Sequence, residues 1–354
     1  AMAAAIGARQ YGADAAVIGS AHAHSRSPET LETLSPRALT VLQHIGIPAS
    51  IIHAQFPPVT ERISRWGLGA GRSRPSVGSL LGGGHVLGKK LLVELLRQRA
   101  QDMGVRFYVA GRKAAAAPVG PTWHIALRID TTNRPMQLEA RFAIDASGRG
   151  AHLARSLGVR KRILDDLVAF WIRGPISELG RCSTAAVTVA DGWLFFVGGG
   201  DGLGAIGYFT SAGRLRGKPR PADILAKLAA APEVAIRMRG QADWALSSVV
   251  AQTASTTVLA SPSGSNWLAC GDALQTLDPL TSSGMLLALT QGSEAGHAAA
   301  ANLRRMTGRT LTEYQERAAA QFSHYLLLRA KFYGLEAHPR AAGFSREQTP
   351  MGPS

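Results

Sequence analysis

The sequence has few cysteines and no long apolar run. Its 354 residues include only two cysteines, Cys182 and Cys270, which are too few for a disulfide framework or a cysteine-rich metal site. We interpret Cys270, which lies in an apolar segment, as a small core residue. No stretch of about 18 apolar residues occurs, so no membrane-spanning helix is expected. The first ten residues lack a basic segment and a cleavage pattern, so we predict no signal peptide and a cytoplasmic protein.

Acidic residues are also scarce. The chain has 24 Asp and Glu against 39 Lys and Arg, which gives a formal net charge of +15. A basic surface attracts nucleic acids, membranes or anionic ligands. However, the basic residues are scattered, with one short cluster at residues 160–162, and no DNA-binding motif accompanies them. We therefore attribute the charge to a general preference for arginine and expect no nucleic-acid partner.

The most informative segment covers residues 267–297. Residues 267–270 predict a short buried strand that leads into Gly271 and Asp272. A loop containing Pro279 follows, and a long apolar helix begins near Gly284. The free N–H groups at a helix start carry partial positive charge. This arrangement predicts a site for an anion or a cofactor.

This segment resembles the second FAD-binding motif of the flavoprotein monooxygenase superfamily. It matches the form GDA…DPLxSxG of the branch that holds tryptophan-halogenase-like and geranylgeranyl-reductase-like proteins and flavoproteins that modify protein side chains. Eight positions agree in order: Gly271, Asp272, Ala273, Asp278, Pro279, Leu280, Ser282 and Gly284. The resemblance implies FAD as the cofactor, with Asp272 near its ribityl or pyrophosphate region. It also implies that the loop through Pro279 and Ser283 presents the N–H groups of Gly284 and Met285 to the flavin pyrimidine.

Two further segments resemble motifs of this superfamily. Residues 142–149, FAIDASGR, resemble its middle motif, which brings Asp145 and Gly148 to the edge of the cofactor crevice. The alternative interpretation of Asp145 is a helix cap at a strand-to-helix turn. Residues 31–36, LETLSP, resemble G-E-[ST]-L-x-P, with Leu31 in place of glycine. Glu32 is then either a residue near the flavin or a solvated carboxylate at a helix start.

Other features of the superfamily are missing. Residues 1–11 predict a helix and residues 15–18 a strand, an order that a strand and a G-x-G-x-x-G turn should precede. We therefore expect the chain to be N-terminally truncated. No acidic residue follows Ile18 to hold the adenosine ribose. A literal G-x-G-x-x-G does begin at Gly202, but both of its flanks resemble strands, which predicts a hairpin instead.

The resemblance implies an α/β fold. We expect a Rossmann-like, doubly wound FAD/NAD(P)-binding sheet, N-terminally truncated, and an antiparallel β-sheet substrate domain. We assign residues 1–48, 85–162 and 255–335 to the FAD-binding domain, 49–84 and 163–254 to the substrate domain, and 336–354 to a tail. The sequence pattern predicts helices at 39–46, 87–103 and 311–335. It also predicts strands at 105–110, 124–129 and 137–141. In the second helix we expect Leu91, Leu92, Leu95 and Leu96 to share one apolar side.

The function that follows is that of an FAD-dependent oxidoreductase, foremost a monooxygenase that hydroxylates or oxidises an aromatic or otherwise electron-rich substrate, either a small molecule or a peptide side chain. Halogenation is disfavoured, because Thr281 stands where flavin halogenases carry glutamate and residues 31–41 lack their lysine. Their G-W-x-W-x-I-P signature is also matched only in part by residues 192–198. A reductase of isoprenoid lipids and a truncated, non-catalytic remnant are the alternatives.

Several roles stay open. No nicotinamide fingerprint is visible, so a separate flavin reductase is a candidate partner. No catalytic residue is assigned. His22 and His24 have no third ligand nearby, so no metal site is expected. The aromatic residues of 193–196 (Trp193, Phe195 and Phe196) form either a substrate wall or a sheet core, and their alternation favours the core.

Overall fold

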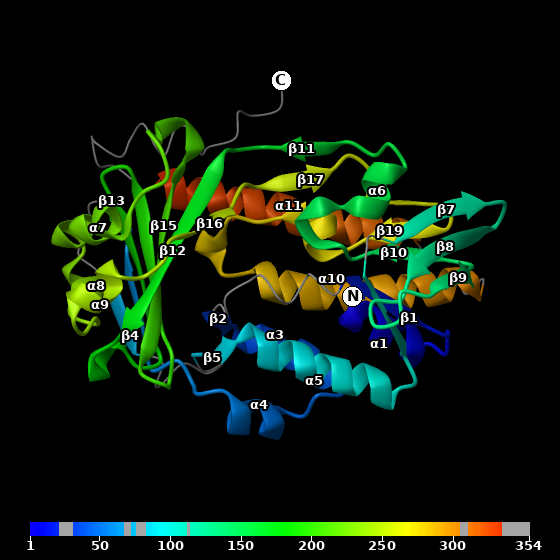
Figure 1. The fold of residues 1–354 in the computed structure, drawn as a ribbon, viewed down its shortest axis with the longest axis horizontal. Coiled ribbons are helices and arrows are strands. Elements are labelled where there is room, and N and C mark those ends of the chain that lie inside the picture. Colours follow the sequence, from blue (N-terminus) through cyan, green and yellow to red (C-terminus); the bar gives the residue numbers. More distant parts are fainter. Residues whose placement is uncertain (21–30, 67–71, 76–82, 112–113, 305–310, 335–354) are drawn as a thin grey trace.

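The computed structural model describes residues 1–20, 31–66, 72–75, 83–111, 114–304 and 311–334. Figure 1 shows a broad antiparallel sheet on one side of the molecule and layers of helices and short strands on the other. His22, His24 and the tail at 336–354 lie outside the described residues. None of the described helices is long and apolar enough to cross a membrane.

Two helices form the centre of the layered half. Helix α1 (Met2–Gln10) packs along α10 (Gly284–Leu303). Small residues allow the backbones to approach closely, because a Cβ on Gly296 would lie 2.0 Å from the carbonyl oxygen of Ala4. A Cβ on Gly7 would lie 2.5 Å from the carbonyl oxygen of Ser293. The predicted helix at residues 1–11 is confirmed as α1. Its small residues are explained by this close contact with α10.

The parallel strands do not form one continuous sheet. Strand β1 (Ala16–Ser20) pairs with β6 (Arg106–Ala110), and β10 (Ala143–Asp145) pairs with β19 (Trp267–Ala269). Within the described residues no backbone ladder joins the two pairs, and β19 instead meets the short antiparallel strand β18 (Ser263–Gly264). The parallel pairing agrees with an α/β fold, but the described strands do not confirm the finer expectation of a doubly wound, Rossmann-like sheet.

The segment around Glu32 forms a strand and not a helix start. Strand β2 (Leu31–Leu34) pairs with β5 (His85–Gly88), so the interpretation of Glu32 as a helix-start carboxylate is wrong. Helix α3 (Pro36–His44) begins earlier than predicted, because the Ser35 side chain accepts a hydrogen bond from the Ala38 N–H and caps it. The helix α4 (Ala49–Gln55) was not predicted.

Helix α5 (Lys89–Asp102) starts two residues later than predicted, because Leu87 belongs to β5. Leu92 and Leu96 are buried in the core as expected. Leu91 is exposed, so the apolar side is narrower than the sequence indicates. The helix packs one stripe inward and presents the rest of its surface to solvent.

The large sheet has seven strands in the order β16-β12-β15-β14-β13-β3-β4. All neighbours are antiparallel except β13 and β3. Gly202, at φ +84°, lies in the turn between β14 and β15, which confirms that its G-x-G-x-x-G motif is part of a hairpin. The strands are β3 (Glu61–Arg65), β4 (Arg72–Pro75), β12 (Leu167–Pro175), β13 (Ser183–Val189), β14 (Gly192–Gly198), β15 (Leu203–Ser211) and β16 (Val250–Thr253).

Short helices cover one face of this sheet, where the sequence predicted only strands. Trp244 of α9 is fully buried in the same core as Phe196. The helices are α7 (Pro221–Leu225), α8 (Pro232–Ala235) and α9 (Gln241–Ala245). Their burial places the described helices of 221–245 against the sheet, with the opposite face turned toward α10 and α11 (Figure 1).

The remaining elements complete the layered half. The predicted strands at 124–129 and 137–141 are confirmed as β8 (Thr122–Arg128) and β9 (Pro135–Ala140). With β7 (Ala115–Val119) they form a three-stranded meander. A second small sheet comprises β11 (Lys161–Ile163), β17 (Thr257–Leu259) and β20 (Gln275–Thr276). Helix α6 (His152–Ser156) follows β10, and the long helix α11 (Leu311–Gly334) runs from this half to the seven-stranded sheet (Figure 1).

Candidate functional site

A cavity of about 520 Å³ lies where β2, the N-terminus of α10 and one face of the seven-stranded sheet meet. It also receives two short 3₁₀ turns, η1 (Gly148–Gly150) and η5 (Gly271–Ala273). The structure brings seven of the nine predicted site residues to its lining. These are Glu32, Gly148, Gly271, Asp272, Pro279, Gly284 and Met285. The other two, Asp145 and Ser283, do not line it.

Helix α10 opens into this cavity without a side-chain cap. Ser282 adopts a left-handed conformation with φ +48°, which turns the chain into the helix. The N-cap residue is Ser283, but its hydroxyl donates to the carbonyl oxygen of Thr281, at 3.0 Å, and caps no N–H group. The first N–H groups of a helix have no partner within the helix. Those of Gly284 and Met285 therefore bring partial positive charge to the cavity wall.

The loop before α10 is held by a buried ionic network that the sequence did not predict. The Asp278 carboxylate accepts hydrogen bonds from the Leu280 N–H at 2.9 Å and the Tyr333 hydroxyl at 2.7 Å. Arg329 lies between two carboxylates, with Nη2 3.1 Å from Asp165 and Nε 3.6 Å from Asp278. Burial raises the pKa of Asp278, and Tyr333 and Arg329 oppose that shift. The sequence contained one sign of this network, the four-residue spacing of Arg329 and Tyr333, which places both side chains on one face of α11.

Asp145 lies behind the cavity wall. Its carboxylate accepts hydrogen bonds from the Ser147 N–H at 3.0 Å, the Ser147 hydroxyl at 2.6 Å and the Ala154 N–H at 2.8 Å. This is the geometry of the helix-cap alternative. The resulting turn presents Gly148 at φ +70°, where an added Cβ would meet no atom within 4 Å. Asp145 thus shapes the wall, and Gly148 forms it.

Charged side chains of both signs line the cavity. Burial raises the pKa of Glu32, the cation of Lys89 opposes this, and the carboxylate of Asp272 adds to it. On the opposite turn, Arg149 Nε lies 3.9 Å from Asp272 Oδ2, and Arg149 Nη1 donates to the carbonyl oxygen of Ser255 at 3.2 Å. Lys89 was missed in the sequence because only the pairing of β2 with β5 brings it beside Glu32.

The sheet contributes an aromatic end to the cavity. Trp171, Phe195 and Phe209 line it, with the Trp171 ring edge-on to Phe209 at 5.6 Å between ring centroids. Trp193 stacks behind Phe209 at 3.8 Å and is buried, as is Phe196. Of the three aromatic residues weighed in the sequence, only Phe195 therefore lines the cavity. The missed residue Trp171 lies two positions before Arg173 on β12, so both side chains share one face of the strand.

No protein-family model and no curated protein matches the sequence. Solved structures do match. The myxobacterial chondrochloren halogenase CndH has a TM-score of 0.83 and 17% identity over 99% of this chain and 84% of its own. The flavin-dependent halogenase CmlS has a TM-score of 0.79 and 20% identity over 100% of this chain and 66% of its own. The peptidyl tryptophan dihydroxylase QhpG has a TM-score of 0.75 and 22% identity over 98% of this chain and 75% of its own. The chain thus shares the fold of these flavoenzymes and spans 66% of the length of CmlS.

Proposed function

We propose that this protein is an FAD-dependent oxidoreductase that hydroxylates or oxidises an electron-rich aromatic substrate, either a small molecule or a peptide side chain. The observation that carries the proposal is the uncapped start of α10, which opens into the same cavity as Gly148 and Asp272. The similar structures include FAD-dependent halogenases and a dihydroxylase of peptidyl tryptophan, which supports both the cofactor and the class of reaction.

The residues that line the cavity fit a flavin. A Cβ on Gly148 or Gly284 would meet no atom within 4 Å, so at both positions the backbone borders open space that a flat ring can occupy. A bound flavin supplies the electron transfer and, when reduced, the reaction with oxygen. The N–H groups of Gly284 and Met285 would stabilise negative charge on the pyrimidine edge. The carboxylate of Asp272 would accept hydrogen bonds from ribityl hydroxyl groups.

The aromatic end of the cavity is the proposed substrate site. Aromatic rings pack favourably edge-to-face or offset against one another. Trp171 is already edge-on to Phe195 and Phe209, which leaves a ring-lined surface facing the cavity. Arg173 lines the same end, and its guanidinium would hold an anionic group of the substrate.

Two matched glycine variants test the flavin site. Gly148 and Gly120 both have positive φ, at +70° and +58°, and both would direct a Cβ into open space. Each change to alanine should therefore cost a similar stability of about 1 kcal/mol. Of the two, only Gly148 lines the cavity, so Gly148→Ala alone should also weaken FAD binding, measured by titration of the apoprotein. Equal FAD affinity in the two variants would contradict the proposed site.

The reaction class is tested separately with the FAD-loaded protein and a supplied reductant. A hydroxylase or oxidase consumes oxygen, whereas a reductase of isoprenoid lipids does not. Product masses measured with bromide present distinguish oxygen insertion from halogenation. A purified wild-type protein that binds no FAD would support the remnant alternative and refute the proposal.

A further inference from the structure

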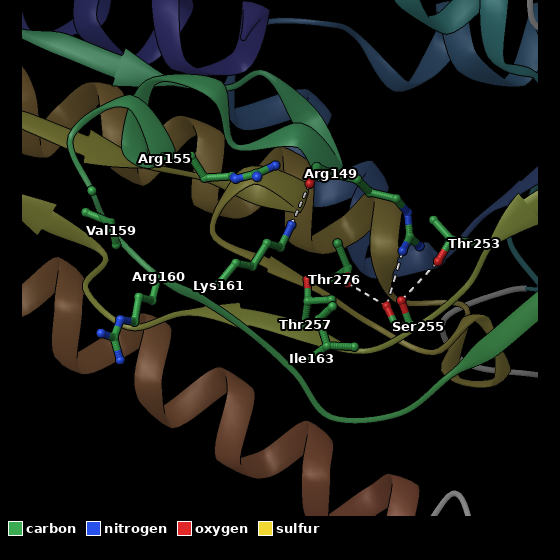
Figure 2. Close-up of a pocket in the computed structure, with 11 residues that line it drawn as sticks. Arg149, Arg155, Val159, Arg160, Lys161, Ile163, Thr253, Ser255, Thr257 and Thr276 are labelled. Carbon is green, nitrogen blue, oxygen red and sulfur yellow. Dashed lines mark hydrogen bonds between the residues drawn. The ribbon is translucent and has the colours of Figure 1, made fainter.

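A second cavity, of about 610 Å³, adjoins the first and shares Arg149 and Thr253 with it. Four of its lining residues are cations: Arg149, Arg155, Arg160 and Lys161. No carboxylate side chain of the described residues lines it. Figure 2 shows Arg155 and Lys161 extending toward Arg149, while Arg160 extends away from them.

Two of these cations have no side-chain partner in the described part of the chain. The side chains of Arg155 and Arg160 form no hydrogen bond or ion pair with any residue that the structure describes. Lys161 Nζ donates to the carbonyl oxygen of Arg149 at 2.7 Å and approaches that of Asp272 at 3.4 Å. Burial is the largest cause that lowers the pKa of Lys161, and repulsion from Arg149 and Arg155 adds to it, while the carboxylates of Asp272 and Asp145 oppose it. An anion in this cavity would relieve that repulsion.

The other wall of the cavity consists of hydroxyl groups. Thr276 donates to the carbonyl oxygen of Ser255 at 2.7 Å, so the 2.8 Å contact with Thr257 requires Thr257 to donate to Thr276. Thr253 and Ser255 share one hydrogen bond of 3.0 Å between their hydroxyl groups. That bond uses one of the two hydroxyl hydrogens, so the other is available to a ligand.

We propose that this cavity binds the phosphate group of a small molecule of about nucleotide size, separate from the flavin. Phosphate oxygens accept several charge-assisted hydrogen bonds at once, which suits the converging side chains of Arg149, Arg155 and Lys161 (Figure 2). The volume lies within the range of small-molecule sites. Ile163, which is 72% exposed, offers an apolar surface beside the cations for the rest of the ligand. Arg149 would connect this ligand to Asp272 in the first cavity.

Calorimetric titration with ADP tests this site, with adenosine as the phosphate-free control. We expect ADP to bind the FAD-loaded wild type and adenosine not to bind. Arg155→Ala should weaken ADP binding roughly tenfold, because it removes one charge-assisted contact. Arg162→Ala is the matched control, because it removes the same charge from strand β11 at a position that does not line the cavity. Its affinity should stay within about twofold of the wild type.

Three results would overturn the proposal. The first is unchanged ADP affinity in Arg155→Ala, and the second is an equal loss in Arg162→Ala, which would indicate only general attraction to a basic surface. The third is release of bound FAD in proportion to the ADP taken up, which would show that the cations hold the pyrophosphate of FAD. If the wild type binds no FAD, the proposed function fails, but the titration of the same protein still decides the phosphate site.

Discussion

Replacing Arg329 with methionine tests how the loop before α10 is held in place. Arg329 is fully buried and lies between the carboxylates of Asp165 and Asp278. Methionine keeps much of the apolar length of the side chain but removes the charge. Both carboxylates then stay buried without their common cation, while Tyr333 still donates to Asp278.

The expected loss is large. Removing one partner of a buried ion pair destabilises a protein by about 3–5 kcal/mol, because the remaining charge stays buried. The loss should also depend on pH. Burial raises the pKa of Asp278 above its ordinary value of 3.8. The folded state therefore binds this proton more readily than the unfolded state, and stability falls as the pH rises through the raised pKa. Arg329 lowers this pKa in the wild type, so its removal raises the pKa of Asp278 further. The variant should therefore have its largest deficit at about pH 8 and a smaller one at about pH 5.

Urea unfolding at the two pH values measures this deficit. Arg317→Met is the control, because Arg317 lies on the same helix as Arg329 and forms a partly exposed ion pair with Glu294 of α10 at 3.7 Å. Exposed pairs contribute about 0–1 kcal/mol, so this variant should remain close to the wild type. An Arg329→Met variant that loses less than about 1 kcal/mol at about pH 8 would refute the inferred role of the network.

Three further predictions concern the first cavity. Asp272→Ala should lower FAD affinity roughly tenfold to a hundredfold, measured by fluorescence titration, while the exposed Asp130→Ala keeps wild-type affinity; equal affinities would contradict the assignment. Trp171→Ala should raise the KM for an aromatic substrate roughly tenfold with FAD retained, and an unchanged KM in steady-state kinetics would exclude Trp171 from the substrate site. The raised pKa of Glu32 makes wild-type stability fall as the pH rises from 4.5 through that pKa. Glu32→Gln should flatten this slope in urea unfolding, and an unchanged slope would place its cause elsewhere.

The segment from residue 267 to 285 was predictable because its signals are local. An apolar strand, a glycine with positive φ at Gly271, and an apolar helix after Ser283 follow one another within a few turns of chain. Lys89 and Trp171 were not predictable in the same way. Each enters the cavity through pairing of strands that are far apart in the sequence. Which side chains meet across such ladders depends on a register that local patterns do not specify.

The errors in the predicted fold also arise from contacts between residues far apart in the sequence. Helices α7 to α9 are each of four or five residues, too short to be stable without packing. Burial of Trp244 against the sheet holds α9, and that contact is invisible in the local sequence. The buried ionic network depends on a local pattern and also on a contact between distant parts of the chain. Arg329 and Tyr333 show helical spacing, but their partner Asp278 lies in a loop about fifty residues earlier.

Helix α11 connects the two ends of the first cavity. Tyr333 donates to Asp278 in the loop that starts α10, and the neighbouring Phe332 accepts a hydrogen bond at 2.6 Å from the indole nitrogen of Trp66. Trp66 lies edge-on to Trp193, which stacks on Phe209 of the aromatic wall. Consecutive residues of one rigid helix therefore hold both the helix N-terminus and the ring-lined sheet face. Reactions between a bound cofactor and a substrate require a fixed separation and orientation, so we infer that α11 maintains both.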